Sequence, residues 1–200
     1  MPLQFRLSLI LACLALVCSG CLGANRTSRH PYSQEQDPRG RPFVVGVADT
    51  LAVTVWRDQE LSTEATVRPD GTITLPLIGE VRASGKTTEQ LTREIRERVG
   101  RFVKDAIVTV AVTEVNSYRF TVAGNVGHPG VFTSRYYVTV SQALALAGGP
   151  NRYADDEIVI VRTDPSGKIR RIPIDYDDIL EGDAPEQDIV ILTGDNIYVP

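Results

Sequence analysis

Two helix-start signals, each surrounded by strand patterns, constrain most strongly what this chain can fold into. Thr87 and Gln90 form a T-x-x-Q capping box, and Thr139 and Gln142 form a second one. On either side of both boxes, apolar and polar residues alternate, which is typical of strands with one buried face. The sequence therefore predicts an α+β protein with two small units, each containing a helix and several strands.

In the first unit, the segment 65–77 predicts a hairpin. Pro69, Asp70 and Gly71 separate two β-rich runs, and Gly71 tolerates the positive φ that such a turn needs. Pro76 predicts a strand end or a sheet edge, because proline cannot donate to a strand ladder.

A helix and two further strands complete this unit. Residues 44–56 and 107–115 predict the strands, since their apolar residues alternate. The helix starts after Thr87, and its apolar residues recur at helical spacing, so we expect them to face the core. They are Leu91, Ile95, Val99 and Phe102.

The second unit predicts a strand, a short helix and then several strands, which is the order of a β-grasp-like domain. The segment 124–130 is a loop dense in turn-forming residues. Leu144 and Leu146 are expected on the inner face of the helix, and Gly148 and Gly149 end it. The predicted strands cover residues 118–123, 158–162, 168–174, 188–192 and 196–199.

The start of the chain predicts export from the cytoplasm. Arg6 precedes a short apolar stretch at 7–17, and two small residues precede Cys21, which together predict a signal peptide over residues 1–20. The apolar stretch is shorter than the roughly 20 residues that a membrane-spanning helix needs. The small-small-Cys ending resembles the lipobox of bacterial lipoproteins, which implies lipid attachment at Cys21. An ordinary signal peptide cleaved nearby is the alternative.

The cysteines and the residues that follow agree with a lipid-anchored protein. All three cysteines, at positions 13, 18 and 21, lie at or before the expected cleavage point, so an acylated chain carries no free thiol into an oxidising compartment. Leu22 is not acidic, which resembles the outer-membrane class of lipoproteins. Residues 21–42 are polar and lack periodicity, and they predict a lipidated N-terminus followed by a flexible tether.

The sequence gives little indication of a catalytic site or a metal-binding site. His30 lies in the predicted tether and His128 in a turn, so they do not form a metal-binding or basic pair. The acidic clusters at 155–157 and 175–183 lack the spacing of a calcium loop and favour a solvated surface over paired glycosidase carboxylates. The sequence has 21 basic and 25 acidic residues, and nothing in it suggests the clustered basic face that binds nucleic acid. We predict a protein that is not an enzyme and that needs no metal or cofactor.

Several segments, in order, resemble the bacterial polysaccharide export lipoproteins, which are outer-membrane exporters of capsule and exopolysaccharide. In residues 43–116 they include VADTLAVTVW and FVKDAIVTVAV, and in residues 117–200 they include FTVAGNVGHPGVF and GDNIYVP. The resemblance implies an α+β fold with a small export domain at 43–116 and one soluble-ligand-binding β-grasp (SLBB) domain at 117–200. Ala48 departs from the pattern, because a glycine usually precedes the aspartate of the first segment.

The same resemblance implies a function in transport. Copies of the chain are expected to form a homo-oligomeric ring on the periplasmic face of the outer membrane, as a conduit for a polysaccharide chain. The sequence stops at Pro200, after the last predicted strand, so we expect a short form without the membrane-spanning C-terminal helix of longer relatives. Such a form contacts the membrane through its lipid anchor only and relies on a separate outer-membrane β-barrel. An inner-membrane polysaccharide co-polymerase is a further implied partner.

Trp56 and Arg57 are the first candidates for contact with sugar, because Trp56 stands where a strand enters a loop. Core or rim packing is the alternative for the aromatic residues. A second set of residues is expected to shape turns, with subunit or sugar contact as its alternative role. This set is Asp70, Gly71, Pro76, Gly79, Gly124, Pro129 and Gly130. The alternative function is a monomeric periplasmic carbohydrate-binding lipoprotein.

Overall fold

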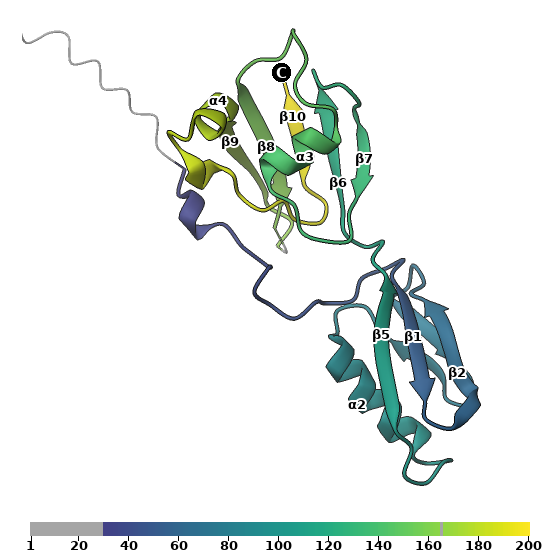
Figure 1. The fold of residues 1–200 in the computed structure, drawn as a ribbon. Coiled ribbons are helices and arrows are strands. Elements are labelled where there is room, and N and C mark those ends of the chain that lie inside the picture. Colours follow the sequence, from purple (N-terminus) through teal and green to yellow (C-terminus); the bar gives the residue numbers. More distant parts are fainter. Residues whose placement is uncertain (1–29, 165) are drawn as a thin grey trace, which may run out of the picture. The chain divides into compact units, whose positions relative to one another are not determined.

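The structure, a computed structural model, describes residues 30–164 and 166–200 (Figure 1). The predicted signal peptide at 1–20 and the predicted lipid attachment at Cys21 lie outside these residues. The described residues contain two separate hydrophobic cores, one between positions 45 and 110 and the other between positions 118 and 199. We call elements β1 to β5 the first unit and elements β6 to β10 the second unit.

The first unit consists of two small antiparallel sheets and one helix (Figure 1). In the three-stranded sheet, β1 lies between β2 and β5, and the two-stranded sheet pairs β3 with β4. The elements are β1 (Thr50–Val55), β2 (Asp58–Thr66), β3 (Thr72–Leu75), β4 (Gly79–Arg82), α2 (Thr88–Val99) and β5 (Val108–Glu114).

Helix α2 begins where the capping box predicts. The backbone N–H of Thr87 donates to Oε1 of Gln90 at 2.9 Å, and the N–H of Gln90 donates to Oγ1 of Thr87 at 3.3 Å, so two otherwise unpaired donors are satisfied. Leu91, Ile95 and Val99 are buried in the first core, as their spacing predicts. The prediction for Phe102 is wrong: α2 ends at Val99, and the Phe102 side chain is exposed beyond it.

The strand partners of the first unit differ from the predicted hairpin. The turn at Asp70 and Gly71 is present, but it links β2 to β3, which belong to different sheets. The hairpins are instead β1–β2, with Val55 opposite Asp58, and β3–β4, with Leu75 opposite Gly79. Local turn chemistry does not determine which strands pair, because each strand also selects the partner that lets it bury its apolar face.

Ala48 adopts a left-handed backbone conformation with φ 74°. Its N–H donates to the carbonyl of Val67 at 2.9 Å, so the turn is held in place despite the strain on a residue with a Cβ. This is the position at which the resemblance implies a glycine.

Replacing Ala48 with glycine is therefore expected to raise the free energy of unfolding by about 0.5–1 kcal/mol, because relief of the left-handed strain exceeds the added entropy of the unfolded chain. Urea unfolding of the two proteins measures the difference. The matched control is Ala52→Gly in the middle of β1, which is expected to destabilise the protein. A lower stability for Ala48→Gly would contradict this account of the turn.

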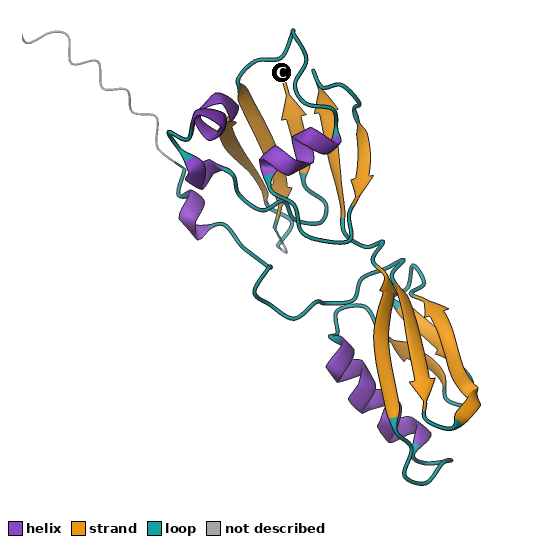
Figure 2. Cartoon of the chain, viewed as in Figure 1, coloured by secondary structure: helices purple, strands orange, loops and turns teal. Residues whose placement is uncertain are grey.

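The second unit contains a five-stranded mixed sheet in the order β7-β6-β10-β8-β9 (Figure 1). The last strand, β10, lies in the centre, parallel to β6 and antiparallel to β8, as expected for a β-grasp domain. Helix α3 lies over one face of the sheet, where Val140, Ala143 and Leu144 join the second core (Figure 2). The strands are β6 (Arg119–Gly124), β7 (Gly130–Thr133), β8 (Glu157–Thr163), β9 (Ile169–Asp175) and β10 (Asn196–Val199), and the helices are α3 (Val140–Leu146) and α4 (Tyr176–Glu181).

Two predictions for the second unit are wrong, and two of its elements are not predicted by the sequence. Residues 188–192 form no extended ladder; they are anchored by a single bridge between Thr139 and Val190. Ile189, Val190 and Ile191 are buried consecutively, so the side chains do not alternate between two faces. Leu146, expected inside, is half exposed at the end of α3. The strand β7 and the acidic helix α4 were not anticipated.

Candidate functional site

Part of the expected flexible tether is docked on the second unit. Residues Tyr32–Gln34 form a short 3-10 helix, and the hydroxyl of Tyr32 donates to the carbonyl of Pro173 in β9 at 2.6 Å. The ring of Tyr32 also packs against the second core. Tyr32 and Glu35 therefore have specific partners on the second unit, and the tether over residues 21–42 stays a prediction.

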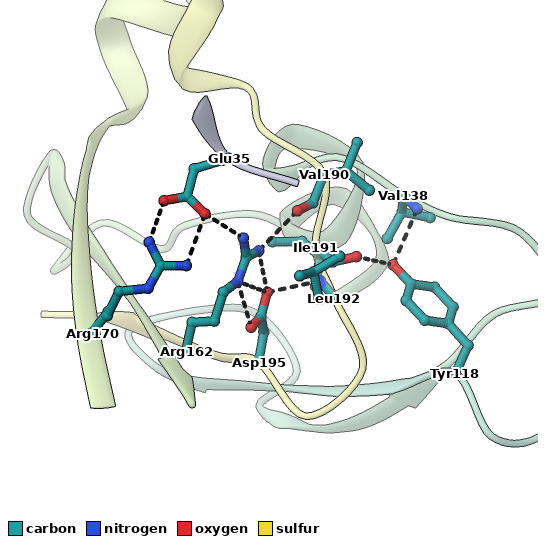
Figure 3. Close-up of polar contacts among 9 residues, drawn as sticks. All are labelled: Glu35, Tyr118, Val138, Arg162, Arg170, Val190, Ile191, Leu192 and Asp195. Atoms are coloured by element: carbon teal, nitrogen blue, oxygen red, sulfur yellow. Dashed lines mark hydrogen bonds and ion pairs between the residues drawn. The ribbon is translucent and has the colours of Figure 1, made fainter. Parts of the chain in front are cut away.

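Glu35 belongs to a buried ion-pair network centred on Arg162 of β8 (Figure 3). The Arg162 Nε donates to both carboxylate oxygens of Asp195, at 2.9 and 3.1 Å, and Nη1 donates to Oε2 of Glu35 at 2.8 Å. Nη2 donates to the carbonyl of Val190 at 2.9 Å. Arg170 of β9 closes the network by donating from Nη1 to Oε1 of Glu35 at 2.7 Å. We call these four charged residues the Arg162 network.

The charges of the Arg162 network balance within the protein. The side chains of Arg162, Glu35 and Asp195 are only 3, 5 and 1% exposed. Water therefore cannot solvate their charges, and the oppositely charged partners must stabilise them. Burial alone would lower the pKa of Arg162, but the adjacent carboxylates of Asp195 and Glu35 raise it overall. The arginine therefore stays charged. A hollow of about 330 Å³ opens beside it, with Arg170 in its wall.

Tyr118, at the start of the second unit, supports the segment 188–192 that leads to Asp195 (Figure 3). Its hydroxyl donates to the carbonyl of Ile191 at 2.8 Å and accepts from the N–H of Val138 at 3.2 Å. Burial raises the pKa of this hydroxyl, so it remains a neutral donor. The Tyr118 hydroxyl thereby links the irregular 188–192 segment to the residues that precede α3.

Asp49 forms a second buried polar cluster where β1 begins. One carboxylate oxygen accepts from the N–H groups of Asn116 and Ser117, both at 2.8 Å. The other oxygen accepts from the N–H of Gly46 at 2.8 Å and from the Ser117 hydroxyl at 2.9 Å. The residue is fully buried. Its carboxylate therefore fixes the chain at Asn116 and Ser117, between β5 and β6.

Trp56 and Arg57 occupy the β1–β2 turn, as their sequence position indicates. Both side chains are exposed, and the Arg57 guanidinium carbon lies 6.0 Å from the centre of the Trp56 ring. The backbone of Arg57 is left-handed, with φ 62°. The two side chains are accessible to a ligand, and sugar contact there stays a prediction.

The predicted turn residues of the first unit lie in two different turns. Asp70 accepts from the N–H of Thr72 at 2.9 Å, and Gly71 has φ 81°. Pro76 directly follows the last residue of β3, and Gly79, with φ 71°, opens β4. The structure therefore does not bring these four residues into one site.

Gly124, Pro129 and Gly130 border the loop between β6 and β7. Gly124 has φ 96°, and a Cβ there would lie 1.9 Å from the carbonyl oxygen of Val199 in β10. Only glycine allows this close approach of two neighbouring strands. Pro129 and Gly130 are exposed at the start of β7. A contact role for this loop with sugar or with another subunit stays a prediction.

Two family models match the chain in succession. The model described as polysaccharide biosynthesis/export protein matches residues 37–113, and the model of the SLBB domain matches residues 119–173. The chain belongs to the polysaccharide export family. The first unit is thus its export domain, and the second unit is its SLBB domain.

The curated relatives of this export-family chain are named for exopolysaccharide production or polysaccharide export. It is 32% identical over 125 residues to the exopolysaccharide production protein ExoF of Rhizobium meliloti strain 1021, a match that covers 57% of this chain and 30% of the relative. It is 30% identical over 142 residues to the EPS I polysaccharide export outer membrane protein EpsA of Ralstonia nicotianae, covering 59% of this chain and 37% of the relative. The EpsA protein of Ralstonia solanacearum is similar at 29% identity over 137 residues, covering 56% and 36%. The match therefore spans about a third of the length of these relatives.

Membership of the export family also settles the class of protein. The family consists of polysaccharide export and binding proteins, so the chain is not an enzyme. Within residues 30–164 and 166–200, no helix is both long and apolar enough to cross a bilayer. The same described residues hold no cluster of three or more His, Cys, Asp or Glu side chains placed to bind a metal ion.

Sequence reasoning missed the two buried polar clusters of the export-family fold. A signal for Arg162 existed, because it shares its strand face with the buried residues Ile158 and Ile160. An arginine at an inward position requires a carboxylate partner. Its partner Asp195 stands 33 positions away and Glu35 stands 127 positions away, so the sequence does not indicate which carboxylates meet it.

Proposed function

We propose that this chain is a lipid-anchored periplasmic subunit of an apparatus that exports polysaccharide, either capsule or exopolysaccharide, across the outer membrane. The observation that carries the proposal is the succession of an export domain and an SLBB domain along most of the described chain. The relatives named EpsA are outer-membrane export proteins. The signal and the small-small-Cys pattern ending at Cys21 support attachment to the periplasmic face of that membrane.

The subunits of the proposed apparatus form a closed homo-oligomer. In the described sheets, β2 and β5 border the export-domain sheet, and β7 and β9 border the SLBB sheet. These edges offer backbone groups to a neighbouring copy. Val131 of β7 and Ile169 of β9 are large apolar side chains that remain exposed at two of the edges. Closure of a head-to-tail contact by rotation produces a ring, and a ring leaves a passage for a polymer along its axis.

The proposed conduit works with membrane partners. A separate outer-membrane β-barrel provides passage through the bilayer, and an inner-membrane polysaccharide co-polymerase delivers the growing chain. The exported polysaccharide itself is the transported ligand. We expect no nucleic acid to take part, since the chain has a net charge of -4.

Deletion of the gene tests the export function. We expect surface polysaccharide to be lost while the lipid-linked precursor remains, because synthesis does not require an export subunit. Complementation with the native gene should restore the surface polymer, and complementation with Cys21→Ser should restore much less because the subunit is no longer anchored. Loss of the precursor together with the surface polymer would contradict the proposal, since it would place the protein in synthesis.

A further inference from the structure

One end of the export domain gathers exposed apolar side chains from three loops. These loops are the β1–β2 turn at 56–57, the β3–β4 turn at 76–78 and the α2–β5 loop at 100–107, and we call them together the export-domain tip. The N–H of Trp56 donates to the carbonyl of Ile107 at 2.9 Å, which joins the first and third loops. Leu77 and Phe102 line one shared hollow, which joins the second and third.

Four large apolar side chains of the tip are exposed. Trp56, Leu77, Phe102 and Ile107 are 65, 53, 61 and 62% exposed. Large apolar side chains that cluster on the surface of a soluble protein mark a site of interaction with a protein or a membrane. Leu77 has φ 64°, so the β3–β4 turn holds an apolar side chain outward in a conformation that favours glycine.

Basic residues accompany these apolar side chains. The three loops contain Arg57, Arg101 and Lys104 against one acidic residue, Asp105, in a chain whose net charge is -4. Arg101 lines the hollow of about 410 Å³ together with Leu77 and Phe102. A guanidinium beside apolar side chains fits a phosphate group at the level of lipid headgroups.

The backbone of the tip suits an environment with little water. Besides the bond from Trp56 to Ile107, the N–H of Ile78 donates to the carbonyl of Pro76 at 2.7 Å, and the N–H of Phe102 donates to the carbonyl of Val99 at 2.9 Å. Amide groups that are paired within the protein lose little on approaching the bilayer interface. None of the three loops offers a sheet edge to a partner strand.

We propose that the export-domain tip inserts into the interface of an anionic phospholipid bilayer. Trp56, Leu77, Phe102 and Ile107 enter the boundary between headgroups and acyl chains, where aromatic and aliphatic side chains are favoured. Arg57, Arg101 and Lys104 contact lipid phosphates. This contact is additional to the lipid anchor, through which alone the sequence predicts membrane contact, and it does not depend on the proposed export function.

Trp56 makes the proposal directly measurable, since it is the only tryptophan in the chain. The full chain is mixed with vesicles of phosphatidylethanolamine and phosphatidylglycerol, and Trp56 emission is recorded with and without acyl-chain-brominated lipid. We expect a blue shift and quenching by the brominated lipid. Because every variant keeps the same N-terminal segment, attachment through that segment does not account for differences at Trp56.

Two tip variants retain the reporter and test the two parts of the contact. Leu77→Ser with Phe102→Ser should weaken the Trp56 response roughly tenfold or more, because two apolar side chains no longer enter the bilayer. Arg101→Glu with Lys104→Glu should reduce the response on anionic vesicles and have little effect on pure phosphatidylcholine. The control is Leu146→Ser with Leu180→Ser, which removes two exposed apolar side chains from helices of the SLBB domain, away from its sheet edges, and should leave the Trp56 response unchanged.

Three results would overturn the proposal. The first is an unchanged Trp56 spectrum in the presence of vesicles. The second is a vesicle-induced shift that persists in Leu77→Ser with Phe102→Ser. The third is a shift produced by protein concentration or by soluble oligosaccharide and not by lipid, which would assign the tip to a second copy or to sugar. Equal thermal unfolding of all variants confirms that folding is unaffected, as expected for substitutions at exposed positions.

Discussion

Replacing Asp49 with alanine is expected to lower the free energy of unfolding by about 4 kcal/mol. The substitution leaves the N–H groups of Gly46, Asn116 and Ser117 without their acceptor in a fully buried position. Each buried donor that loses a charged acceptor costs about 1–3 kcal/mol, and some of that cost is recovered when water enters. Urea unfolding monitored by Trp56 fluorescence and by circular dichroism measures the change.

Asp49→Asn is the matched variant for this prediction. It keeps one oxygen as an acceptor but places an NH₂ group against N–H donors, so an intermediate loss of stability is expected. Glu60→Ala serves as the surface control, because Glu60 is exposed in β2. A change of less than about 1 kcal/mol for Asp49→Ala would mean that these hydrogen bonds are replaceable by water.

Asp195→Ala is expected to produce the second large effect, a loss of about 3–5 kcal/mol, because it leaves Arg162 buried with half of its counter-charge. It also removes the acceptor of the Leu192 N–H, which donates to Asp195 at 2.8 Å. Thermal and urea unfolding measure the loss. We expect the irregular 188–192 segment to become sensitive to protease in this variant, since Asp195 ties it to β8.

The exposed pair of Asp37 and Arg39 provides a control for the Arg162 network. Its atoms approach to 2.7 Å, but both side chains are about half exposed, so Asp37→Ala should leave stability unchanged within error. In addition, Arg162→Met with Asp195→Leu should be less destabilised than Asp195→Ala alone, because the uncompensated buried charge is removed. If Asp195→Ala unfolds like the native protein, the network does not hold the fold together.

The elements that the sequence predicts well are those specified by neighbouring residues. The start of α2 follows from Thr87 and Gln90, and its buried face follows from Leu91, Ile95 and Val99. The strand β5 follows from simple alternation. Phe102 was misplaced because periodicity alone does not show where a helix ends, and α2 stops three residues earlier.

The parts that the sequence does not reveal depend on residues far apart in the chain. Asp49 contacts Ser117 across 68 positions, and Glu35 contacts Arg162 across 127 positions. Strand pairing is similarly remote, since β1 selects β5 as its second neighbour. Ala48 was the informative exception: the resemblance implied a glycine there, and the structure shows a left-handed backbone.

The candidate contact residues also divide into those that the local sequence indicates and those that depend on remote parts of the chain. Trp56 was expected at a strand end and lies there, because alternation defines that end locally. Its neighbours in the export-domain tip, Leu77 and Phe102, come from other turns and were not connected with it. Docking of Tyr32 and Glu35 on the SLBB domain was also missed, because polar composition predicts a tether and does not reveal a partner.

Native mass spectrometry of the detergent-extracted, delipidated protein tests most directly whether this export-family chain is a conduit subunit. The account predicts one defined homo-oligomer that persists on dilution and that dissociates when the exposed strand edges are blocked by charged substitutions such as Val131→Glu. A protein that remains monomeric at every concentration and binds oligosaccharide as a monomer would contradict it.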